Sequence, residues 1–70
     1  MIEIVRTEFW EAVYKDGVRL DQGHEIQIED LLRHLGFECK SYYVEMDVFE
    51  NNYMEFPEIL VDDLRNLAIW

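Results

Sequence analysis

The sequence contains one cysteine, one proline and three glycines, and no lysine or arginine lies between Ser41 and Leu64. A single cysteine excludes a disulfide within these 70 residues and is typical of proteins in a reducing compartment. No apolar run approaches the roughly 20 residues that a membrane-spanning helix needs. The first residues also lack the basic start of a signal peptide. We therefore expect a soluble, cytoplasmic protein.

Length and composition predict one compact domain over residues 1–70. Apolar residues make up 50% of the chain and aromatic residues 14%, which is more than a disordered segment carries. A chain of this length buries only about 60% of the surface that its unfolded form exposes. We expect modest stability unless a partner or a second copy adds to it.

Negative charge is concentrated in about one third of the chain. Sixteen aspartates and glutamates stand against six lysines and arginines, which gives a formal net charge of −10. Seven of these carboxylates fall between Ser41 and Leu64, where no cation interrupts them. Such a field opposes contact with nucleic-acid phosphates or anionic lipid, and it attracts a basic protein surface. We therefore expect neither nucleic acid nor a membrane as a direct partner.

The first third of the chain predicts a β-hairpin. Residues 2–14 are rich in β-branched and aromatic side chains, and Asp16-Gly17 is a strong signal for a tight turn into a return strand over residues 18–22. Apolar groups occupy both faces of residues 2–14, which is typical of a central strand or of a register change near residues 7–9.

The remainder predicts two helices and two further strands. Apolar residues recur with a helical period over residues 28–35, and Gly36 suits the position just after a helix. Alternation predicts a strand over residues 38–49 and a short strand over residues 53–56, and Pro57 suits the first turn of a last helix. The order ββαββα predicts an α+β two-layer sandwich, with two helices on one face of an antiparallel sheet.

Within the acidic stretch, the part of the expected strand over residues 42–49 places carboxylates and aromatic side chains side by side. Alternation places Tyr43, Glu45, Asp47 and Phe49 on one face, with the two carboxylates about 6.7 Å apart. Regularly spaced carboxylates on a rigid strand can imitate phosphates, and flanking aromatics supply contact area. The alternative is an ordinary solvated face of a half-buried sheet.

The aromatic residues exceed what a small core needs. Those left over are candidates for an exposed patch that contacts a partner or a second copy of the chain. We assign to the core Phe9, Trp10, Tyr14, Phe37, Tyr42 and Phe56, and to the patch Tyr43, Phe49, Tyr53 and Trp70.

Catalytic and metal chemistry find little support in the sequence. His24, His34 and Cys39 do not show the paired spacing of zinc ligands, and no orienting group or oxyanion motif accompanies them. Glu45 and Asp47 could form a carboxylate pair, but a domain this small has little room for a substrate cleft. We expect no metal, no cofactor and no enzymatic activity.

The leading hypothesis is a small acidic protein-binding module that inhibits a partner by occupying its basic, nucleic-acid-binding surface. Small acidic proteins of this type are made by phages and mobile elements, against partners such as a nuclease, a CRISPR effector or a polymerase. The alternative is a structural or assembly subunit, or a homodimer, that buries the spare aromatics in a permanent interface. The expected partner-binding residues are Tyr43, Glu45, Asp47, Phe49, Glu50, Tyr53, Glu55, Glu58, Asp62 and Asp63.

Overall fold

The computed structural model describes residues 1–24 and 32–69, and it confirms a mixed α+β fold. Residues 32–34 form a helical turn ahead of the fourth strand. The predicted order ββαββα is not confirmed. The strands and helices are β1 (Ile2–Arg6), β2 (Trp10–Lys15), β3 (Val18–His24), β4 (Cys39–Tyr43), α2 (Met46–Asn52) and α3 (Asp62–Leu67).

The four strands form one mixed sheet in the order β3-β2-β1-β4. β2 runs antiparallel to both β1 and β3, whereas β4 runs parallel to β1, so the expectation of a purely antiparallel sheet is wrong for that pair. The single strand expected over residues 2–14 is in fact two strands. Between them the Thr7 amide donates to the Trp10 carbonyl at 2.8 Å, and the Trp10 amide donates to Thr7 Oγ1 at 3.0 Å. Because β1 and β2 are both inner strands, both of their faces carry apolar side chains.

The turn predicted at Asp16-Gly17 is confirmed. Asp16 has φ of 52° and Gly17 has φ of 84°, which are the positive values that a two-residue hairpin of type I′ requires. A register shift between Val13 and Tyr14 follows in the pairing of β2 with β3.

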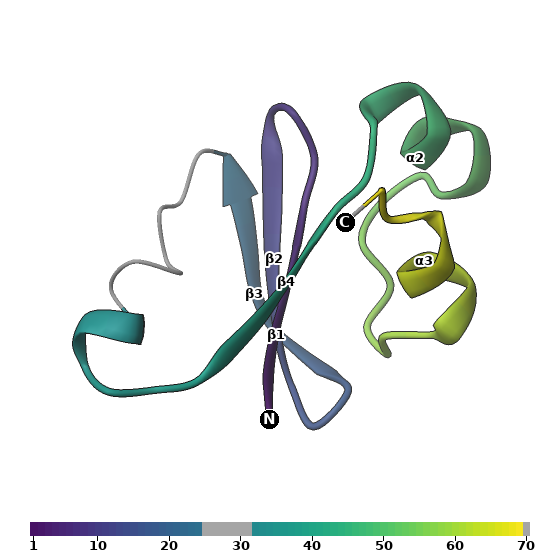
Figure 1. Ribbon diagram of the computed structural model, residues 1–70. Helices are drawn as coiled ribbons and strands as arrows, with labels where there is room; N and C mark the ends of the chain where they lie inside the picture. The colour runs from purple at the N-terminus through teal and green to yellow at the C-terminus, as the bar shows by residue number, and fades with distance from the viewer. Residues whose placement is uncertain (25–31, 70) are drawn as a thin grey trace.

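The core lies between the sheet and the last two helices. In Figure 1, α2 and α3 lie on one side of the strands, and residues 32–34 lie on the other side. The two-layer arrangement with both helices on one face is therefore not confirmed. The cluster that packs α2 and α3 on the sheet comprises Val5, Ala12, Tyr14, Tyr42, Val44, Phe49, Phe56, Leu60 and Leu64.

The strand expected over residues 38–49 is wrong beyond Tyr43, because α2 begins at Met46. The partner strand β1 ends at Arg6, whose carbonyl accepts a last hydrogen bond from the Val44 amide at 2.8 Å, so the ladder cannot continue. Met46 and Phe49 also fit a helical period, and a short apolar run of this kind satisfies both patterns.

Residues 53–61 form neither the expected strand nor the start of a helix. Ile59 instead makes an isolated antiparallel bridge with Val18, and the last helix begins only at Asp62. Pro57 does not open the helix: its carbonyl accepts a hydrogen bond from the Tyr14 hydroxyl at 2.6 Å. This segment covers the first part of β3, because the Arg19 amide donates to the Glu58 carbonyl at 2.8 Å.

The helix expected over residues 28–35 lies mostly outside the described residues, but its predicted end is present. Gly36 has φ of 92°. Its amide donates to the Arg33 carbonyl, and the Phe37 amide donates to the Leu32 carbonyl. These two bonds define a Schellman motif, which confirms Gly36 as the residue after the helix.

The assignment of aromatic residues to the core is correct only in part. Tyr14, Tyr42 and Phe56 are buried as expected, but Phe9 and Phe37 are more than half exposed. Trp10, also assigned to the core, is 37% exposed.

Candidate protein-binding surface

Helix α2 and the bend after it carry four of the seven carboxylates that lie between Ser41 and Leu64. Glu45 stands at the N-cap position, Asp47 lies in the first turn, and Glu50 and Glu55 lie further along; all four are exposed. Asp47 is favoured where it stands, because the N-terminus of a helix carries partial positive charge. The acids predicted over residues 45–55 therefore lie at the start of a helix, on it and in the bend after it, rather than on a strand.

The expected face of Tyr43, Glu45, Asp47 and Phe49 does not exist as one strand face. Phe49 is only 4% exposed and belongs to the core, where its ring lies 4.8 Å from that of Phe56. Phe49 therefore cannot act as an exposed anchor in the folded protein.

The two predicted tyrosine anchors are half-buried. Tyr43 ends β4, and its carbonyl accepts a hydrogen bond from the Ile69 amide at 2.9 Å. Tyr53 stacks on Phe49, with ring centroids 5.7 Å apart, and packs against the core. Both residues have structural roles, and each keeps only part of its surface for a partner. Trp70, the last of the spare aromatics, lies outside the described residues.

The acids near α3 divide into paired and unpaired groups. Asp62 accepts a hydrogen bond from Arg65 at 2.8 Å, so its charge is already partly neutralised. Glu58 and Asp63 are exposed, and the described part of the chain gives neither carboxylate an ion-pair partner. The surface that we call the acidic surface is therefore made of the unpaired acids Glu45, Asp47, Glu50, Glu55, Glu58 and Asp63.

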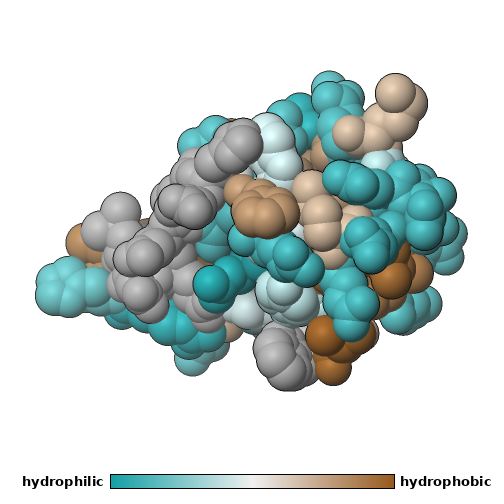
Figure 2. Space-filling view, turned by 90° about the horizontal axis from the view of Figure 1, so that it is seen from above, coloured by the Kyte–Doolittle hydropathy of each residue, from teal (hydrophilic) through white to brown (hydrophobic). Residues whose placement is uncertain are grey.

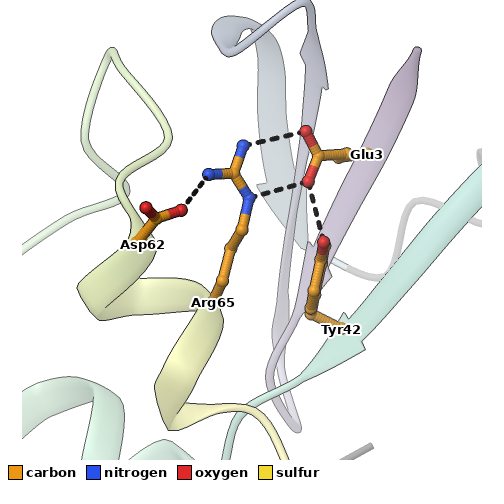
Figure 3. A network of polar contacts seen from close by, with 4 residues as sticks. All are labelled: Glu3, Tyr42, Asp62 and Arg65. Carbon is orange, nitrogen blue, oxygen red and sulfur yellow. Dashed lines mark hydrogen bonds and ion pairs between the residues drawn. The ribbon is translucent and has the colours of Figure 1, made fainter.

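Arg65 and Glu3 fix the position of α3 against the sheet (Figure 3). Arg65 Nε donates to Glu3 Oε2 at 2.8 Å, and its Nη2 donates to Glu3 Oε1 at 2.9 Å. The Tyr42 hydroxyl donates to the same carboxylate at 2.9 Å. The hydrogen bonds from Arg65 hold the pKa of Glu3 below its usual value despite burial, and the carboxylate in turn raises the pKa of Arg65.

Two contacts with the sheet hold the bend that follows α2. The Arg19 guanidinium donates to the Phe56 carbonyl, and the Tyr14 hydroxyl donates to the next carbonyl, that of Pro57. Burial raises the pKa of Tyr14 to about 12, so its hydroxyl stays protonated and remains a donor. The bend that presents Met54 and Glu55 is therefore fastened at its base.

A groove of about 380 Å³ lies between this bend, α2 and the ends of β2 and β3. Trp10 and Gln22 form its sheet side, and Met46 and Glu50 come from α2. Met54 is fully exposed. Seen from above, this end of the molecule has apolar side chains among hydrophilic ones (Figure 2). The lining residues are Trp10, Gln22, Met46, Phe49, Glu50, Met54, Glu55 and Phe56.

The sequence did not predict the groove, although two of its lining residues, Glu50 and Glu55, were expected to bind a partner. Trp10 was assigned to the core, and Met46 was not among the expected partner-binding residues. The unused signal was the helical spacing of Met46, Phe49 and Glu50, which puts one apolar stripe beside a carboxylate. In the pairing of β2 with β3, Trp10 is opposite His24 and Gln22 is opposite Ala12. Gln22 and Trp10 therefore share one end of the sheet only through a register that a single sequence does not reveal.

Within residues 1–24 and 32–69, no group of three or more His, Cys, Asp and Glu side chains is placed to hold a metal ion. No helix of that part of the chain is long and apolar enough to cross a membrane. Comparison with protein-family models, with curated proteins and with solved structures gives no match.

Proposed function

We propose that the protein is a small acidic binding module that inhibits another protein by occupying its basic, nucleic-acid-binding surface. The observation that carries the proposal is the acidic surface itself. Six exposed carboxylates of residues 45–63 have no ion-pair partner among the residues that the structure describes. Ordinary solvated surfaces intersperse charges of both signs, whereas residues 41–64 contain no lysine or arginine.

The mechanism is competitive occlusion without chemistry. Carboxylates on a helix and an anchored bend take the arginines and lysines that would otherwise hold phosphates. Opposite charge speeds the encounter and rejects anionic competitors, and the affinity falls as salt screens the field. Partners of the expected kind are a nuclease, a CRISPR effector or a polymerase of a cell that a phage or mobile element enters.

The test is retention of host proteins on immobilised protein, compared between two variants of equal charge. Glu45→Lys with Asp47→Lys reverses the exposed start of α2, and Glu8→Lys with Glu38→Lys makes the same charge change at two exposed positions elsewhere. The first variant should lose partners that the native protein retains at low salt, and the second should keep them. Equal retention by the native protein and the first variant would reject this surface.

A homodimer is the second candidate, because exposed apolar side chains also gather at the start of β3. Val18 and Ile59 form a bridge there and are 49% and 55% exposed, and Leu20 is 60% exposed. A dimer held by this patch should persist or tighten at high salt, since apolar contacts are not screened. Sedimentation equilibrium at low and high salt separates it from a charge-driven complex.

A further inference from the structure

We propose that the groove between α2, its following bend and the β2–β3 end of the sheet receives an arginine side chain of the partner protein. This inference rests on the proposed function and specifies how the acidic surface engages its target. Its apolar walls include Trp10, Met46 and Met54, and the acidic residues Glu50 and Glu55 also line it.

The charge of the groove selects a cation. Among the described residues, no lysine or arginine lines the groove, and neither Glu50 nor Glu55 has an ion-pair partner. A purely apolar ligand would desolvate these carboxylates without replacing the lost hydrogen bonds. An anionic ligand would meet two charges of its own sign. A cation on an apolar stem can pack its stem against the apolar walls and place its charge beside the carboxylates.

The shape and chemistry favour arginine over lysine. A guanidinium is planar, is weakly hydrated, and donates in a fork that matches a carboxylate. It also stacks on an indole face, and Trp10 lines the sheet side of the groove with 37% of its surface exposed. Methionine side chains adapt to ligands of varied shape, and Met54 is fully exposed at the bend. The volume of about 380 Å³ accommodates one such side chain with its neighbouring backbone.

The experiment is a fluorescence titration with hexaarginine and hexalysine peptides in a Trp70→Phe background. The chain has two tryptophans, so Trp10 is then the sole indole and reports on the groove. Hexaarginine should change the fluorescence emission of Trp10 and should bind about fivefold more tightly than hexalysine. The two peptides carry the same charge, but only arginine can stack on the indole and donate two hydrogen bonds to one carboxylate.

Two variants of equal charge locate the binding. Glu50→Gln with Glu55→Gln should weaken hexaarginine binding about fivefold or more. Glu58→Gln with Asp63→Asn removes the same charge outside the groove, and it should weaken hexaarginine binding less than about twofold. Met54→Ala should also weaken binding, because it removes part of a wall and no charge. Circular dichroism spectra like that of the native protein would show that the variants fold.

The outcomes separate this inference from the proposed function. If the two charge variants weaken hexaarginine binding equally and the protein does not prefer arginine to lysine, the arginine site in the groove is rejected. Charge-driven occlusion by the acidic surface would then remain the proposed function. No binding of either peptide at low salt would overturn both. A dimer that Met54→Ala dissociates would assign the groove to a second copy of the chain and overturn the arginine site.

Discussion

Arg65 on α3 forms a two-pronged hydrogen-bonded ion pair with Glu3 on β1, across 62 residues of sequence (Figure 3). The carboxylate of Glu3 is nearly buried, and Tyr42 on β4 donates a third hydrogen bond to it. Through Glu3, this one cation therefore links the last helix to the parallel pair of strands β1 and β4. Arg65 is the single lysine or arginine after Lys40, and the sequence does not show that its partner is Glu3, 62 residues away.

Arg65→Gln should destabilise the protein more than any change to the exposed acids. The substitution leaves the buried Glu3 carboxylate without its cation, which should cost about 2–4 kcal/mol of unfolding free energy. Asp62→Asn is the matched control: Asp62 is 86% exposed, and its loss should cost less than about 1 kcal/mol. Urea denaturation of both variants measures the difference, and equal costs would contradict a special role for Glu3.

The same pair predicts a dependence of stability on acid pH. The folded-state pKa of Glu3 lies below the ordinary 4.5, so its contribution is present above that pH and is lost as pH falls through the folded value. The other carboxylates also titrate in this range, so the measurement is the difference in unfolding free energy between native protein and Glu3→Gln. This difference should shrink steadily below pH 4.5. A constant difference would contradict the lowered pKa.

Tyr14→Phe tests the anchor of the bend that carries Met54 and Glu55. Loss of the hydrogen bond to the Pro57 carbonyl should cost about 1 kcal/mol. Because burial raises the pKa of Tyr14 from 10.0 to about 12, its contribution is full below pH 10 and is lost as pH rises through the folded value. Stability measured from pH 9 to pH 12 should therefore fall more steeply in native protein than in Tyr14→Phe. Parallel curves would count against this coupling.

Gly17→Ala should destabilise the β2–β3 hairpin. Apart from its two chain neighbours, no described residue has an atom within 4 Å of the position that its Cβ would take, so the cost comes from the positive φ of 84° and not from a clash. We expect about 1 kcal/mol for alanine and much less for Gly17→Asn, because asparagine tolerates the left-handed region. Thermal unfolding of the two variants measures this, and an equal loss for both would indicate a different cause.

Local signals predicted the parts of the fold that local chemistry determines. The turn at Asp16-Gly17 and the helix end at Gly36 both depend on positive φ, which few residues adopt. The mixed α+β class followed from the alternation of apolar periods. The parallel pairing of β4 with β1 could not be predicted, because it joins segments far apart in the sequence and no single residue encodes it.

The acidic region shows where a pattern was ambiguous. The alternation over residues 42–49 fits a strand, but Met46 and Phe49 fit a helix equally well, and the end of β1 at Arg6 decides between them. Tertiary context thus moved Phe49 into the core. The exposed acids Glu45, Asp47 and Glu50 were predicted correctly as surface residues in either case.

The most direct test of the central claim is displacement by nucleic acid. Proteins that the immobilised native chain retains at low salt, and that the Glu45→Lys, Asp47→Lys variant does not retain, are challenged with increasing concentrations of a short DNA duplex or RNA. If the acidic surface occupies nucleic-acid-binding surfaces, the duplex or RNA should release these proteins in proportion to its concentration. Retention that neither nucleic acid disturbs, at concentrations that saturate the retained proteins, would contradict charge mimicry as the function.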